Sequence, residues 1–187
     1  MRNKKVNGNS EILAPEGFFQ KHRWAILLGL LVLLMLLDGL DDRYGWASTA
    51  GLWGLSCLFL GVVGATERNT FLRITMAVPV LAWFVLLLMA EFFGMTVNGG
   101  LYALAALMLF GSMIISFRQL FAPVHSEYER LSSGVFGYLL IVMLWGLAYW
   151  RIEAAYPGSF NMPEDIAGQK AGFVYFSMIT MTTVGYG

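Results

Sequence analysis

The last five residues of the sequence, Thr183-Val184-Gly185-Tyr186-Gly187, have the chemistry of a loop that can strip water from a potassium ion. Gly185 and Gly187 permit backbone dihedral angles that are closed to residues with a Cβ atom. Successive carbonyl groups can therefore turn toward one axis instead of alternating as they do in a strand. Four chains around that axis would replace the hydration shell of the ion with rings of carbonyl oxygens, and the Thr183 hydroxyl group would add a further ring.

The ion ligands that we predict in this loop are Thr183, Val184, Gly185 and Tyr186. The side chain of Tyr186 is expected to face away from the axis and to brace the loop against aromatic neighbours. One chain supplies only a quarter of each carbonyl ring, so the interpretation requires a homotetramer. In this interpretation K⁺ is the permeating ion, and no cofactor is expected.

The segment before the loop, from about Lys170 to Thr182, is apolar but too short to cross a membrane. A half-span that descends toward a glycine-containing loop is tolerated only where protein surrounds it, which predicts a re-entrant helix. The carboxyl end of this helix would present the negative end of its dipole to a cation. The residues expected to support the loop from this helix are Tyr175, Phe176, Thr180 and Thr182.

These residues carry a resemblance to a known family. Thr183-Val184-Gly185-Tyr186-Gly187 is the selectivity-filter signature of potassium channels, and residues 173–187 resemble the pore helix plus filter of bacterial channels of the two-helix pore type. Residues 133–140, 145–149 and 156–160 resemble the outer helix and turret of bacterial ion-channel proteins with this pore. The resemblance covers roughly residues 132–187, and a chance match of five residues in a loop is the alternative.

The resemblance implies a potassium-selective channel protomer in a bacterial inner membrane. It also implies an inner helix after the filter, which is absent from these 187 residues. We therefore expect the sequence to be a truncated part of a longer chain. The alternative function is a non-conducting truncated membrane subunit that assembles with full-length channel subunits or suppresses them.

The composition indicates an integral membrane protein. Of the 187 residues, 58% are hydrophobic and 13% are charged, whereas a soluble domain carries about 25% charged residues. The mean hydropathy is +0.65.

The net charge of zero suggests no nucleic-acid partner, and no small-molecule substrate is evident. His22 and His125 lie far apart, and no cluster has catalytic or metal-ligand spacing, so no enzyme is expected. The single cysteine, Cys57, is expected to be a small buried apolar residue.

The apolar runs predict an all-α integral membrane fold with four transmembrane helices before the pore unit. These runs cover residues 25–37, 47–65, 72–95 and 101–117. A signal peptide is the alternative for the first run, and packing is the expected role of the glycines in the second. We divide the chain into a cytoplasmic segment (1–23), a four-helix transmembrane domain (24–118), a cytoplasmic linker (119–132) and a partial pore domain (133–187).

The linker contains Ser126-Glu127-Tyr128-Glu129, a capping-box arrangement that predicts a helix start. We interpret residues 119–132 as a short helix on the membrane surface, with a plain loop as the alternative. The partial pore domain then comprises an outer helix over residues 134–150, a turret, the re-entrant pore helix and the filter loop, with the inner helix absent.

The basic residues orient the chain with a cytoplasmic amino terminus, because cytoplasmic loops carry the excess of Lys and Arg. Nine of the twelve basic residues then fall inside: Arg2, Lys4, Lys5, Lys21, Arg23, Arg68, Arg73, Arg118 and Arg130. This orientation places the segment before the filter outside. The acidic residues there either raise the cation concentration at the mouth or are solvated loop charges: Glu153, Glu164 and Asp165.

The fourth run, residues 101–117, contains no Arg or Lys. Steep voltage gating needs several charges in the membrane, so we predict little voltage dependence. Glu91 is the one ionisable residue well inside a run, either as a proton- or ion-sensing site or as an interface-facing carboxylate.

Overall fold

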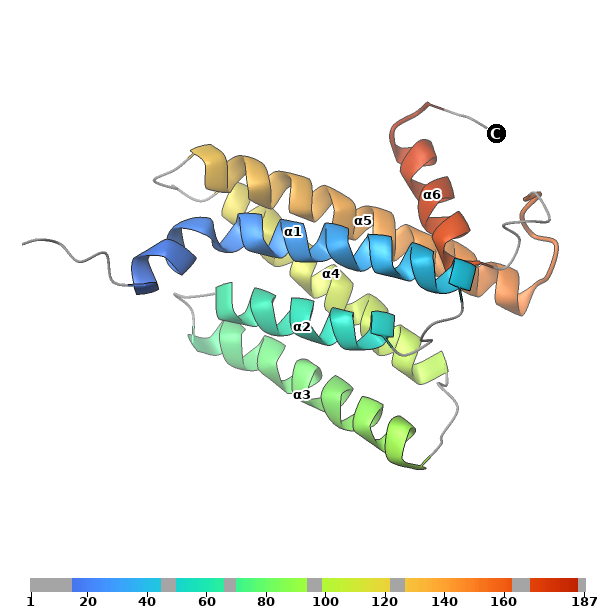
Figure 1. Cartoon of the computed structure of the whole chain (residues 1–187), viewed down its shortest axis with the longest axis horizontal. Helices are drawn as coiled ribbons and strands as arrows, with labels where there is room; N and C mark the ends of the chain where they lie inside the picture. Colours follow the sequence, from blue (N-terminus) through green and yellow to red (C-terminus); the bar gives the residue numbers. More distant parts are fainter. Residues whose placement is uncertain are drawn as a thin grey trace, which may run out of the picture.

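In the computed structural model, the described residues are 15–44, 50–65, 70–93, 99–121, 127–162 and 169–184, and they contain helices and no strand. The helices are α1 (Pro15–Tyr44), α2 (Ala50–Ala65), α3 (Thr70–Phe93), α4 (Gly99–Phe121), α5 (Glu127–Ala155) and α6 (Lys170–Met181) (Figure 1). The predicted all-helical fold is confirmed. Each of α1 to α5 contains all or most of one of the apolar runs, and residues 47–49 and 94–95 of these runs lie outside the described residues. An α-helix satisfies the backbone polar groups within the segment itself.

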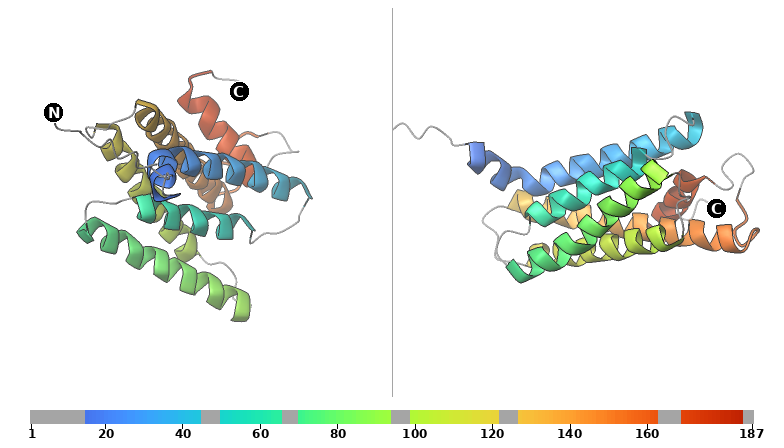
Figure 2. Two further views of the ribbon diagram at one scale, coloured as in Figure 1. Left: turned by 60° about the vertical axis from the view of Figure 1, so that its left-hand side comes forward. Right: turned by 90° about the horizontal axis from the view of Figure 1, so that it is seen from below.

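The helices α1 to α5 form a bundle in which α5 packs against both α4 and α1 (Figures 1 and 2). Consecutive helices contact each other from α1 to α4, and the most extensive contact in the molecule joins α4 to α5. The first helix therefore meets the fifth directly, although three helices separate them in the sequence. The helix α6 contacts α5 and, less extensively, α1.

The interpretation of residues 119–132 as a separate surface helix is wrong. Residues 119–121 are the last turn of α4, and residues 127–132 are the first turns of α5, which continues to Ala155. A helix does start at Glu127, where the capping-box pattern predicts it. Buried contacts extend the helix through this polar start, because Ser132 and Ser133 lie against the bundle and the Ser116 hydroxyl donates a hydrogen bond to the Ser133 carbonyl at 2.5 Å.

The centre of the bundle is filled by large side chains from α1, α2, α3 and α5. Trp24 and Phe136 are fully buried, with their rings edge to face at 5.8 Å. Trp83 is also fully buried, and its indole nitrogen donates a hydrogen bond of 2.9 Å to the hydroxyl of Ser56. This bond between α2 and α3 satisfies the only polar atom of the indole, which is costly to leave unpaired in an apolar interior.

Two glycines of the second apolar run allow α2 to approach α1 closely, as predicted. A Cβ atom at Gly54 would lie 2.9 Å from Cδ1 of Leu34, and one at Gly61 would lie 2.5 Å from Cδ2 of Leu27. The expectation for Cys57 on the same helix is wrong, because its side chain is exposed. It lies on the side of α2 that faces away from the helices that pack against it.

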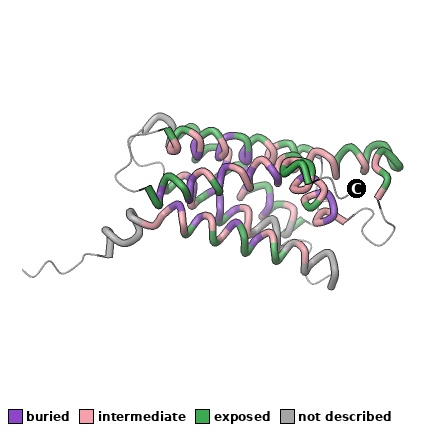
Figure 3. The backbone as a smooth tube through the Cα atoms, turned by 90° about the horizontal axis from the view of Figure 1, so that it is seen from above, coloured by how far each residue is buried: buried purple, intermediate pink, exposed green. Residues whose placement is uncertain are grey.

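Figure 3 shows where the exposed residues lie along the helices, and many of them are large apolar side chains. On α3 the exposed large side chains are Ile74, Val78, Leu81, Val85, Leu86, Met89, Phe92 and Phe93. So wide an apolar surface is a contact surface for lipid or for another protein. By length and composition, two helical segments among the described residues can cross a membrane, Gly100–Phe121 and Glu127–Ala155, and shorter apolar segments occupy His22–Leu37, Gly54–Gly64 and Ala77–Ala90.

Candidate functional site: the carboxyl end of α6

The twelve-residue helix α6 stands at a steep angle to α5 and leads to the carboxyl end of the chain (Figure 1). It approaches α5 closely at Gly146, where a Cβ atom would lie 2.9 Å from both Cα and Cγ2 of Val174. A side chain at position 146 would therefore push α6 away from α5. Because Gly146 has no side chain, α6 can cross α5 at this position.

An aromatic cluster holds the other side of α6 against α5 and the segment that follows α5. It consists of Tyr149, Phe160, Phe173 and Phe176. Phe160 lies 5.6 Å from the fully buried Phe173 and 5.7 Å from Phe176, and Tyr149 lies 5.4 Å from both Phe160 and Phe176, with interplanar angles of 60° to 79°. Such edge-to-face pairs each contribute about 0.5–1.5 kcal/mol beyond their burial. Phe176 thus holds α6 against α5 through its contacts with Tyr149 and Phe160.

The turn after α5 places Phe160 in this cluster, and Glu153 organises the turn. One carboxylate oxygen of Glu153 accepts a hydrogen bond from the Gly158 amide at 2.7 Å, and the other accepts one from the Phe160 amide at 3.0 Å. Gly158 has φ of 85°, a left-handed conformation that glycine adopts without steric cost. Glu153 is half-buried and lies in the last turn of α5, so it is not the solvated loop charge of the second interpretation. Glu164 and Asp165 lie outside the described residues.

The carboxyl end of α6 closes with two backbone hydrogen bonds that run backward over the last turn. The Thr183 amide donates to the Thr180 carbonyl at 3.1 Å, and the Val184 amide donates to the Ile179 carbonyl at 3.2 Å. Together they form a Schellman motif, whose residue beyond the cap adopts the left-handed conformation and is usually glycine. Here that residue is Thr183, with φ of 56°, after Thr182 as the cap.

Thr183 is thus a β-branched residue in a region of backbone space that such residues rarely enter. A left-handed residue with a Cβ costs about 1–2 kcal/mol, and strain of this kind gathers at functional sites. It stands at the first position of Thr-Val-Gly-Tyr-Gly. The sequence interpretation assigned the unusual backbone to Gly185 and Gly187, which lie outside the described residues, as does Tyr186.

The remaining predicted support residues divide into two kinds. The hydroxyl groups of Thr180 and Thr182 donate to carbonyls of α6 itself, namely to Phe176 at 2.8 Å and to Met178 at 2.9 Å. Both hydrogen bonds hold the threonine side chains against the last turn of α6. Tyr175, by contrast, is 54% exposed and stands apart from the aromatic cluster. Its side chain lines a cavity between α6 and α1 instead.

A second aromatic group holds the amino-terminal end of α6. The rings of Tyr102 from α4 and Trp150 from α5 lie 5.0 Å apart. The guanidinium carbon of Arg151 is 5.4 Å from the Tyr102 ring, and the Lys170 ammonium is 5.4 Å from the Trp150 ring. These cation–π contacts join the start of α6 to the starting turn of α4.

Sequence reasoning missed three residues that position α6: Gly146, Phe173 and Glu153 in its role as an acceptor. The first two lie in segments that the resemblance covers, where the spacing shows a helix but not which face meets which neighbour. The role of Glu153 could have been recognised in the sequence, since it precedes the turn-forming Pro157 and Gly158 by a few residues. A carboxylate at that distance can accept hydrogen bonds from the free amides of a turn.

Comparison of the chain with protein-family profiles, with curated proteins and with solved structures finds no match.

Proposed function

We propose that the chain is the protomer of a potassium-selective ion channel and that Thr183-Val184-Gly185-Tyr186-Gly187 is its filter. The observation that carries the proposal is the Schellman end of α6. A short helix, too short to span, terminates through a strained Thr183 at the first residue of the filter sequence. The K⁺ ligands are Thr183, Val184, Gly185 and Tyr186, arranged as carbonyl rings by four chains.

The proposal places the first four helices and α5 across a bacterial inner membrane, with the amino terminus in the cytoplasm. The apolar outer faces and the apolar segments within α1 to α5 support it, as does the excess of basic residues on the cytoplasmic side. The helix α6 then enters from the outside and stops part of the way across. The contacts of α6 with α1 and α5 cover part of its surface with protein, and a re-entrant segment requires such a protein environment.

The helix end also supplies an electrostatic reason for cation binding. The aligned peptide dipoles give the carboxyl end of a helix roughly half a negative elementary charge. The end of α6 lies directly before the filter sequence, so four such ends around one axis favour a cation at the inner mouth of the filter.

The test is ion flux into liposomes that contain the protein expressed from its complete gene. We expect K⁺ to pass far better than Na⁺. Gly185→Ala should abolish the selectivity, because the added Cβ closes the backbone conformations that the filter needs. Gly64→Ala is the matched control, since position 64 has open space for a Cβ. Equal K⁺ and Na⁺ flux in the wild type, or unchanged selectivity in Gly185→Ala, would contradict the filter assignment.

A further inference from the structure

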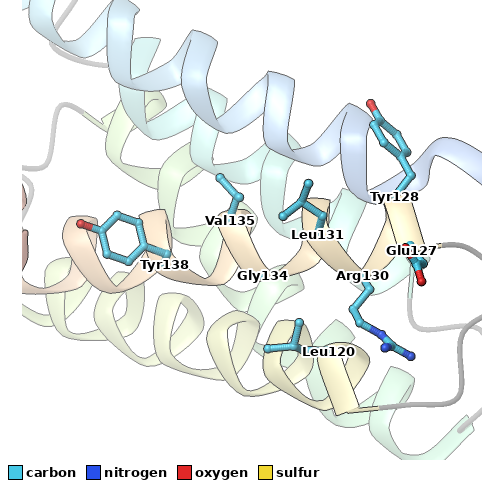
Figure 4. A pocket seen from close by; sticks show the side chains of 8 residues that line it. All are labelled: Leu120, Glu127, Tyr128, Arg130, Leu131, Gly134, Val135 and Tyr138. Atoms are coloured by element: carbon cyan, nitrogen blue, oxygen red, sulfur yellow. The ribbon is translucent and has the colours of Figure 1, made fainter.

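A groove lies on the outside of α5 near its amino-terminal end, on the side next to the last turn of α4 (Figure 4). Its volume is about 730 Å³. Leu120 of α4 forms one wall, and Leu131 and Tyr138 of α5 lie along its length. Gly134 lies in the middle, where a Cβ would be 3.4 Å from Cδ1 of Leu120. The missing side chain at position 134 makes the groove deep enough to hold an apolar chain.

The polar end of the groove carries one negative and one positive charge. Glu127 and Arg130 both line it, both are exposed, and they are three residues apart on α5, hence neighbours on the helix surface. Figure 4 shows the Arg130 side chain reaching past the groove toward the end of α4. Among the described residues, the groove therefore has two charged side chains at one end and mostly apolar side chains along its walls.

Aromatic side chains mark the depth of this rim. Tyr128 is 56% exposed, and its ring lies edge to face with the His22 ring of α1 at 6.2 Å. Tyrosine gathers at the level of lipid head groups because one end is apolar and the other is polar. From Arg130 the groove continues to Tyr138 over eight residues, about 12 Å of helix, which is most of a leaflet about 15 Å thick.

We propose that this groove binds a phospholipid whose zwitterionic head group ends in a primary ammonium, the phosphatidylethanolamine class. The phosphate pairs with the guanidinium of Arg130, and the ammonium donates hydrogen bonds to the Glu127 carboxylate. One acyl chain lies over Gly134 between Leu120 and Tyr138. The inference rests on the membrane location within the proposed function, and not on ion conduction.

The charge pattern selects this head group over the other common ones. An anionic phosphatidylglycerol satisfies Arg130 with its phosphate, but its uncharged glycerol offers the Glu127 carboxylate only hydroxyl donors and no positive charge. A phosphatidylcholine has a quaternary ammonium without an N–H group, so it makes no hydrogen bond to the carboxylate. The hydrogen bonds of a primary ammonium to a carboxylate are charge-assisted and about twice as strong as neutral ones.

The experiment is native mass spectrometry of the full chain in mild detergent, titrated separately with dioleoyl phosphatidylethanolamine, phosphatidylglycerol and phosphatidylcholine. We expect the wild type to bind phosphatidylethanolamine tightest. Arg130→Gln should weaken binding of all three lipids by about tenfold, the scale of one charge-assisted hydrogen bond. Glu127→Gln should instead remove only the preference for phosphatidylethanolamine.

Two variants complete the design. Gly134→Met should fill the groove and weaken all three lipids together, and Arg118→Gln is the control, an exposed arginine at the same end of the bundle that does not line this groove. Equal binding of the three lipids by the wild type would overturn the proposal, as would unchanged affinities in Arg130→Gln or an unchanged preference in Glu127→Gln. Ion flux is measured independently, so a loss of potassium selectivity with intact lipid preference would contradict the proposed function alone.

Discussion

Thr183 occupies a conformation that glycine would adopt more easily, and in the proposed filter its hydroxyl group is the reason for a threonine at this position. A glycine at this position would relieve the strain but would remove the side-chain oxygen that can join the ring of ion ligands. The residue type is therefore a compromise between backbone strain and ligand chemistry.

The first prediction follows from this strain. Thr183→Gly should raise the free energy of unfolding by about 1 kcal/mol and should lower potassium selectivity, because the hydroxyl is lost. Thr183→Ala is the matched variant that loses the hydroxyl and keeps the strain, so its stability should not rise. Thermal unfolding in detergent and flux in liposomes measure the two effects. A Thr183→Gly protein no more stable than Thr183→Ala would show that φ at this residue carries no strain.

The second prediction concerns Glu153. Glu153→Gln leaves one acceptor oxygen for the two amides of the turn, and should cost about 1–2 kcal/mol of stability. Hydrogen exchange at the Gly158 and Phe160 amides should become faster, and it can be read by mass spectrometry. If exchange at both amides stays unchanged while K⁺ flux falls, then Glu153 acts on the ions at the mouth and not as an acceptor for the turn.

At the scale of the elements, the crossing of α5 and α6 depends on one missing side chain. Gly146→Ala would bring a Cβ within 2.9 Å of the Val174 backbone, and backbone cannot rotate away as a side chain can. We expect a loss of about 1–3 kcal/mol in unfolding free energy. Gly29→Ala on α1 is the control, since position 29 has open space and alanine favours a helix by about 1 kcal/mol. Equal effects of the two variants would contradict the tight crossing.

The contact of α2 with α3 can be measured by a double-mutant cycle on Ser56 and Trp83. Ser56→Ala leaves the buried indole N–H unpaired and should cost about 1–3 kcal/mol. In the background of Trp83→Phe, the same serine change should cost much less, because no donor is left without a partner. The difference is the coupling between the two side chains. Additive effects would show that the bond of 2.9 Å contributes nothing to stability.

At the scale of the whole molecule, the proposed channel should respond to voltage according to the number of charges in its fourth helix. Within α4 the one basic side chain of the described residues is Arg118, and it is exposed near the end of the helix. One elementary charge moved across 100 mV gains about 2.3 kcal/mol, and steep gating uses several charges. We predict that open probability changes little between −100 and +100 mV, as measured in planar bilayers. A steep voltage dependence would require charges that move from elsewhere in the chain.

Much of the fold could be predicted from the sequence because long apolar runs decide where helices lie, and α6 was predicted within one residue of its ends. The capping-box pattern predicts the start of α5, but residues 127–133 are mostly polar and do not reveal that this helix continues into the next apolar run. The buried contacts of Ser132 and Ser133 show that it does. The partners of Phe160 and Phe173 depend on how a turn folds back on α5. Such contacts arise between segments and leave no periodic signal in either one.

The direct contact between α1 and α5 sets an order of events during synthesis. Trp24 packs on Phe136, so the first helix must wait for more than a hundred residues to be made, roughly ten seconds at ribosomal rates. Until then α5 is not there to pack against Trp24. The helix α6 rests on that late pair and docks last. Insertion partners that shield α1 from premature association would therefore govern how much of the protein reaches its final form.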